Sequence, residues 1–277
     1  MDLVAGRGNL RVAFVLGLAL AVVVPSVALS ASLAGAAGAP VDLLPDLRMA
    51  KLYDVQIQTT STGRKKLRFG TIVYNVGDGP LEVRGRARNG TEMDEVYQWI
   101  ADDQGGGREV LNPAARMFYS GDGHNHWHVG GFITVQLWLK GSPNNDHKLR
   151  KIGFCLVDLR NYSPPPPNTP SLRVYPPSGC GVESWQQIGP PTRERGMGIS
   201  VGWGDDYEPQ FTHQAIDITG LPKGNYRLCA TANAGWLWAE KADNHANNYF
   251  WYDLSLNPAQ NRFTRYNSGR TACPPPP

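Results

Sequence analysis

Charged side chains are scarce in this sequence, at 18% of 277 residues. The formal net charge is only +3, and no block of Lys and Arg is longer than 64–66. Disordered chains and coiled coils carry more charge, and nucleic-acid-binding proteins gather theirs into a basic stripe. We therefore expect a folded protein with a sizeable core that does not bind nucleic acid.

Long helical patterns are also few, because 31 Gly and 22 Pro interrupt the chain. Apolar and polar residues instead alternate in short segments, the mark of half-buried strands. The clearest are 67–76, 81–83, 132–139, 226–230 and 250–256. The segment 93–100 fits either a helix or one arm of a hairpin ending near 111, and we favour the hairpin. The sequence predicts an all-β fold, an antiparallel, sandwich-like domain with long loops and few short helices.

The one long apolar run lies near the N-terminus. Arg7 and Arg11 precede the run 12–24, and small residues follow as far as Ala39. This order is typical of a secretory signal peptide. The run is shorter than the ~20 residues that span a bilayer, although extending it to Leu29 approaches that length. We expect residues 1–39 to be a signal peptide, or an N-terminal membrane anchor, with a small-residue linker. The protein would then be secreted or held on the outer face of the cell membrane.

Cysteine is rare as well, with four in the chain. In an exported protein an even number indicates disulfides. Local pairing would join Cys155 to Cys180 and Cys229 to Cys273, although spacing alone leaves three connectivities open.

Proline gathers in two tracts, 164–167 and 274–277. The first lies in a long predicted loop, 160–191, of the kind that is usually functional or mobile. The second ends the chain. We expect the folded domain to cover 40–256 and a C-terminal tail to cover 257–277.

Three histidines alternate with other residues at His124, His126 and His128. Side chains two apart on a strand point to the same side, so the three imidazoles would project together and could bind Cu, Zn, Fe or Ni. An ideal strand would spread the outer two by about 13 Å, so one ion can bind all three only where the backbone bends. Glycines that would permit a bend flank the run at 121, 123, 130 and 131. The alternatives are a solvated strand face without metal, or two histidines completed by a distant ligand.

With this motif the chain resembles the lysyl oxidase family, copper-dependent amine oxidases that act on peptidyl lysine, in a short form similar to bacterial members. The family follows its three histidines with a Phe, which is Phe132 here. Further similar segments are Leu44–Leu47, Phe154–Leu156, Gln214–Thr219, Pro222–Tyr226 and Asn247–Asn248. The resemblance covers roughly 43–256, nearly the whole expected domain. It implies that His124, His126 and His128 bind copper, and it favours the Cys155–Cys180 bridge.

The resemblance also implies a quinone cofactor, lysyl tyrosylquinone, which the family builds from one Lys and one Tyr. Lys151 stands three residues before the Phe-Cys pair, and Tyr207 nine residues before Ile216, as in the family. A quinone supplies the electrophile and electron sink that ordinary side chains lack. The implied activity is oxidative deamination of peptidyl lysine or small primary amines to aldehydes, using O₂ and releasing H₂O₂ and ammonia.

A general base would be needed to take the substrate's proton. The candidates by position are Asp205, Asp206, Asp217 and Asp243, with His213 as a proton carrier. Asp217 lies between Ile216 and Ile218, which favours a structural role.

Two other functions compete with the oxidase. One is a non-catalytic metal-binding β-domain of the cell surface, which would have no reason to keep Lys151 and Tyr207. The other is a different three-histidine enzyme, such as a cupin-like dioxygenase or a zinc hydrolase. A cupin needs a further Glu and a fourth His at its own spacing, and the sequence does not have that layout.

Overall fold

The chain divides into two compact units, Met1–Ala39 and Pro40–Pro277. The computed structural model describes residues 38–87, 93, 95–120, 126–142, 147–180, 186–189, 192–241 and 245–273. The predicted signal segment therefore lies almost wholly outside the described residues. Among the residues described, no helix is long and apolar enough to cross a membrane.

Three antiparallel sheets form the second unit and confirm the all-β prediction. The first sheet has the order β1 (Asp42–Leu43), β6 (Glu95–Asp102), β5 (Leu81–Ala87), β13 (Thr192–Ile199) and β12 (Gln186–Gly189), with β7 (Gly107–Leu111) paired to β6. The second has the order β10 (His147–Phe154), β9 (His126–Leu139), β16 (Gly224–Ala232), β17 (Tyr249–Asn257) and β18 (Arg262–Gly269), with β8 (Met117–Ser120) paired to β9.

The third sheet has the order β11 (Arg160–Asn161), β14 (Trp203–Tyr207), β4 (Lys65–Asn75) and β15 (Ala215–Asp217). Two further strands pair with β4, namely β2 (Leu47–Met49) and β3 (Tyr53–Thr59). Helical structure in the described residues is limited to the 3-10 turns η1 (Pro177–Cys180), η3 (His245–Asn248) and η4 (Pro258–Gln260).

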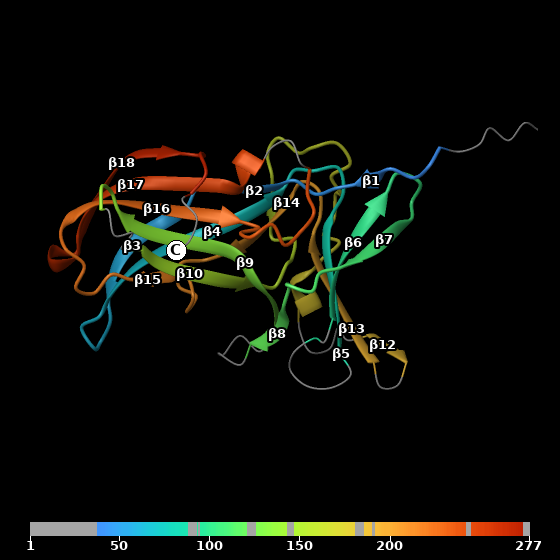
Figure 1. Ribbon diagram of the computed structural model, residues 1–277, viewed down its shortest axis with the longest axis horizontal. Helices are drawn as coiled ribbons and strands as arrows, with labels where there is room; N and C mark the ends of the chain where they lie inside the picture. Colours follow the sequence, from blue (N-terminus) through green and yellow to red (C-terminus); the bar gives the residue numbers. More distant parts are fainter. Residues whose placement is uncertain are drawn as a thin grey trace, which may run out of the picture. The chain divides into compact units, whose positions relative to one another are not determined.

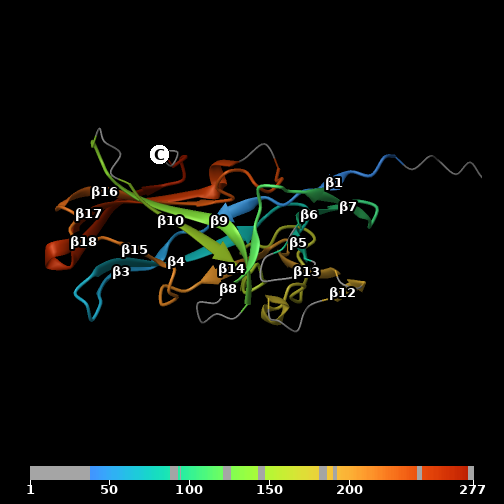
Figure 2. The same cartoon turned by 60° about the horizontal axis from the view of Figure 1, so that its bottom comes forward.

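The second and third sheets lie one above the other. Figures 1 and 2 show β3, β4 and β15 beneath the layer of β9, β16 and β17. Alternate residues of β4 (Leu67, Phe69 and Val73) are fully buried, as are Leu228 and Ala230 of β16. The period-2 pattern in the sequence thus supplies the apolar faces that make the core.

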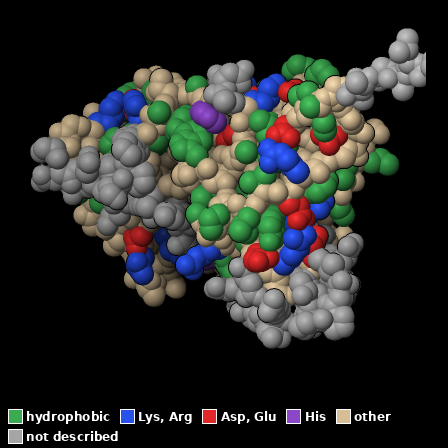
Figure 3. Space-filling model, turned by 45° about the vertical axis from the view of Figure 1, so that its right-hand side comes forward, with side chains coloured by type: hydrophobic (Ala, Val, Ile, Leu, Met, Phe, Trp, Pro, Cys, Tyr) green, Lys and Arg blue, Asp and Glu red, His purple; other side chains and the backbone are tan. Residues whose placement is uncertain are grey.

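The ambiguous segment 93–100 belongs to a hairpin, as favoured. β6 pairs with β7, with Tyr97 opposite Leu111. Arginines and glutamates form an ion-pair network across this sheet: Arg84 binds Glu82 and Glu109, and Arg86 binds Glu109 and Glu194. Figure 3, which turns this part of the unit forward, shows acidic and basic side chains next to one another. The network therefore neutralises most of its own charge.

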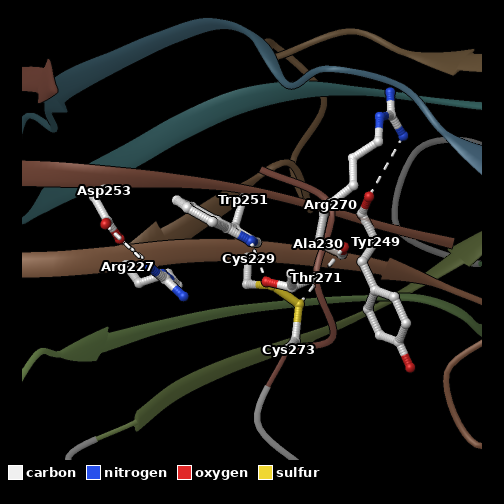
Figure 4. Close-up of a disulfide and its surroundings, with 9 residues drawn as sticks. All are labelled: Arg227, Cys229, Ala230, Tyr249, Trp251, Asp253, Arg270, Thr271 and Cys273. Carbon is white, nitrogen blue, oxygen red and sulfur yellow. Dashed lines mark hydrogen bonds and ion pairs between the residues drawn. A yellow bond between two sulfur atoms is a disulfide. The ribbon is translucent and has the colours of Figure 1, made fainter. Parts of the chain in front are cut away.

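The predicted C-terminal tail is wrong for most of its length. β18 pairs with β17, and Cys273 forms a disulfide with Cys229 of β16 (Figure 4). The sequence hides this strand because Arg262–Gly269 is an edge strand with exposed side chains and no apolar alternation. Of the expected tail, 274–277 lies outside the described residues.

The predicted loop 160–191 is also more structured than expected. β11, η1 and β12 lie within it. The Asp158 carboxylate accepts hydrogen bonds from the backbone N–H groups of Val174 and Tyr175, and Trp203 Nε1 donates to the Pro170 carbonyl. The bonds to Asp158 fasten the loop to the segment before β11, and the bond from Trp203 fastens it to β14. Among the described cysteines none is free, and Cys155 is disulfide-bonded; the Cys180 side chain lies outside the described residues.

Candidate metal and cofactor site

His126 and His128 begin β9, and their side chains lie together as the alternation predicts. The two Nε2 atoms are 2.7 Å apart, and the ring centroids are 4.6 Å apart. This is the length of an N–H···N hydrogen bond between imidazoles. It is also close to the ~3 Å that separates two nitrogens bound to one ion at about 2.0 Å.

The predicted bend lies just after the histidines. Between β9 and β10, Ile152 pairs with Ile133 but Phe154 pairs with Val129, so β9 carries extra residues there. Gly131, with φ +69, occupies the left-handed region that favours glycine. Because of the bulge, the part of β9 that carries His128 and the part beyond Phe132 can run in different directions.

Tyr207 ends β14 and lies beside His128. Its ring centroid is 6.4 Å from that of His128, 4.0 Å from that of Phe154 and 5.7 Å from that of Phe211. The ring is buried, and its hydroxyl oxygen accepts a hydrogen bond of 2.7 Å from the backbone N–H of Cys155. The chain thus brings an oriented phenol next to the paired imidazoles.

Lys151 lies on the same strand as Phe154, which packs on Tyr207. Its backbone pairs with Thr134 of β9. The Lys151 side chain and all of His124 lie outside the described residues. In the part of the chain that is described, no three His, Cys, Asp or Glu side chains form a metal-binding group. The structure therefore brings together two of the three predicted ligands and one of the two predicted cofactor residues.

Gly153 is a site residue that the sequence reasoning did not single out. A Cβ added to it would lie 3.3 Å from His128 Cβ and from the Val129 carbonyl oxygen. Glycine therefore lets β10 pass close behind the His128 side chain. Nothing in the local sequence around Gly153 indicates a role in the site. Its closeness to His128 depends on how β10 pairs with β9 across the bulge, which the sequence does not specify.

Two of the candidate bases are held in ion pairs. Asp206 accepts hydrogen bonds from Tyr53 Oη at 2.5 Å and from Arg160 Nε at 2.7 Å. Asp217 binds Thr219 and Arg64, and the hydrogen bonds from Thr219, helped by Arg64, lower its pKa to about 2. Both carboxylates fasten strands together, which fits the expectation for Asp217. Asp243 lies outside the described residues, and His213 is half-buried.

Asp205 is different. It is 0% exposed, and neither carboxyl oxygen makes a hydrogen bond of standard geometry within the described parts of the chain. Burial raises its pKa well above the ordinary value, and the nearby backbone N–H of Asp206 only partly opposes this. A buried polar group without a partner is rare and costs free energy. The sequence named Asp205 as one of four acids, and only the structure separates it from the others.

Comparison with known proteins adds no family assignment. The chain matches no model of a known protein family. It is also not significantly similar to any curated protein.

Proposed function

We propose that this protein is an exported copper amine oxidase of the lysyl oxidase type. It would deaminate peptidyl lysine or small primary amines with O₂, giving an aldehyde, H₂O₂ and ammonia. The observation that carries the proposal is the meeting of the His126 and His128 Nε2 atoms beside the buried, oriented ring of Tyr207. Simple metal storage does not require a phenol at that place.

The residues present fit the groups that this activity needs. Two imidazole nitrogens separated by 2.7 Å suit a single copper ion, which accepts neutral imidazole readily. His126 and His128 would hold the ion with His124. Tyr207 and Lys151 would form the quinone, which when bound would supply the electrophile for the amine and the electron sink for its oxidation.

The chain's own residues orient and shield this centre. The Cys155 N–H fixes the phenol oxygen of Tyr207, while Phe154 and Phe211 pack on its ring. Apolar rings on two sides exclude water and strengthen the electrostatic interactions within the site. The disulfide at Cys155 and the bonds between β14 and the loop after β11 limit movement of these two segments.

The first test uses the exported chain loaded with copper in air. We expect about one bound copper per chain and a slow rise of visible quinone absorbance. His126→Ala and His128→Ala should each lose copper, and Tyr207→Phe should keep copper but form no quinone. Phe263→Leu is the matched control, because it changes a partly buried ring of β18 that packs on the core and has no part in the proposed site.

The outcomes separate the two main hypotheses. Copper binding with no quinone after full loading would favour a non-catalytic metal-binding domain and would contradict the oxidase. Copper binding that survives both histidine substitutions would contradict the site itself.

A further inference from the structure

The buried carboxyl of Asp205 is unexplained by the fold. Asp158 provides the contrast, because it is equally buried but accepts hydrogen bonds from Val174, Tyr175 and Ser200. In the described part of the chain, no donor makes a hydrogen bond of standard geometry to the Asp205 carboxyl. Replacing a residue like Asp158 would break a network, whereas nothing in the described residues depends on the charge of Asp205.

Asp205 lies on the side of β14 that faces the site. Residues two apart on a strand point the same way, so Asp205 shares a face with Tyr207. Asp206 points to the opposite side, where it meets Tyr53 and Arg160. The unpartnered carboxyl is thus directed to the same layer as the phenol, the imidazoles and the packed aromatic rings.

Among the described residues, no positive charge balances Asp205. The charges that act on it are those of Asp206 and Asp158, both acidic, and no cation of the described residues is among them. β14 pairs with β11, which carries Arg160, and with β4, which carries Tyr74 opposite Gly204 and, beyond the paired part, Lys65, Lys66 and Arg68. β13 belongs to another sheet but also contacts β14, and its described side chains include Glu194 and Arg195. Arg160 is bound to Asp206 on the other face. An incoming ammonium group would therefore supply a cation that the described residues do not place beside an ionised Asp205.

We propose that Asp205 is the proton acceptor of the site, the residue that converts the substrate's ammonium group into a reactive amine beside Tyr207. This role rests on the proposed oxidase function. An ammonium nitrogen has no free electron pair and cannot attack an electrophile. When its N–H bond breaks, the electron pair stays on nitrogen and the proton passes to a carboxylate oxygen of Asp205. Ammonium and carboxylate become amine and carboxylic acid, and burial favours this neutral pair.

The first experiment needs no activity. Infrared spectra of the metal-free protein at about pH 5.5, where an ordinary Asp is ionised, should contain the C=O band of a protonated carboxyl. Asp205→Asn should remove this band, and raising the pH should abolish it in the parent protein. If the two proteins have the same carboxyl band, Asp205 is ionised and paired, and the proposal is wrong.

The second experiment uses the copper-loaded enzyme. Asp205→Asn should retain copper and quinone absorbance but lose about 10² to 10⁴-fold in kcat/KM, the usual contribution of a general base. The fall in kcat/KM towards acidic pH, which reports protonation of the base, should also be absent from this variant. Asp253→Asn is the control, because Asp253 is a buried aspartate bound to Arg227 and Lys140 and is not among the charges that act on Asp205: it should lower thermal stability and leave the pH profile unchanged.

The outcomes distinguish this role from the function on which it rests. An Asp205→Asn enzyme with parental kcat/KM and pH profile overturns the role of Asp205 alone. A quinone-free, inactive parent protein overturns the oxidase function and this role with it.

Discussion

Two regions of the β-unit treat buried polar groups in opposite ways. In the disulfide region around Cys229–Cys273, the buried Asp253 carboxylate binds Arg227, and Trp251 Nε1 donates to Thr271 (Figure 4). Lys140 also binds Asp253. In the site region around His128 and Tyr207, the Asp205 carboxyl makes no hydrogen bond of standard geometry to any described residue. The first region is built for stability. The second keeps a group that weakens the fold, which is expected where function outweighs stability.

The largest expected effect is loss of the disulfide. The disulfide joins residues with a sequence separation of 44. By restricting the unfolded chain, a loop of this size stabilises the fold by roughly 4 kcal/mol. Replacing both Cys229 and Cys273 by Ser should lower the free energy of unfolding by about that amount, measured by urea denaturation. Copper content at low temperature should not change. Loss of copper from protein that is still folded would show that the two regions are coupled.

The second effect is a pair of opposite pH dependences. Burial alone raises the pKa of Asp253, but hydrogen bonds from Arg227 and Lys140 outweigh it and leave the pKa below the ordinary value. Asp253 therefore stabilises the fold fully at pH values above the pKa that it has in the unfolded chain. This stabilisation is lost as the pH falls through the lower pKa that Asp253 has in the folded protein. Asp253→Asn should cost about 2 kcal/mol at pH 7 and progressively less below about pH 4.

Asp205 should behave in the reverse way. Its pKa is higher in the folded protein than in the unfolded chain. The stability that its protonated form contributes is therefore complete below the pKa of the unfolded chain and is lost as the pH rises through the pKa of the folded protein. Asp205→Asn should match the parent protein at acidic pH and become the more stable of the two as the pH increases. Denaturation curves over a pH series measure both variants. If both aspartates show the same sign of pH dependence, the contrast between the regions is wrong.

The smallest effect tests the close packing behind His128. Gly153→Ala puts a methyl 3.3 Å from His128 Cβ, so the imidazole must move by a few tenths of an ångström. We expect a stability loss of about 1 kcal/mol and copper affinity about 10-fold weaker, as for other residues that orient ligands. Gly196→Ala is the control, because its added Cβ meets nothing within 4 Å. Equal copper affinities in the two variants would show that Gly153 does not help to orient His128.

The sequence predicted those parts of the structure that local pattern specifies. Alternation located the strands of the core, and the spacing of His126 and His128 predicted that their rings would meet. It missed β18, because an exposed edge strand has no apolar face, and it missed Gly153, because register brings that residue to His128. It named Asp205 but could not distinguish it from Asp206, because neighbouring residues of one strand differ only in the face to which they point.

We propose that the histidines and Tyr207 form a copper-dependent cofactor site together with Lys151. The most direct measurement is peptide mass spectrometry of the protein after copper loading in air. We expect one cross-linked species that joins the peptides containing Lys151 and Tyr207. This species should be absent from Tyr207→Phe and from metal-free protein. Full copper occupancy with both peptides recovered separately and unmodified would contradict it.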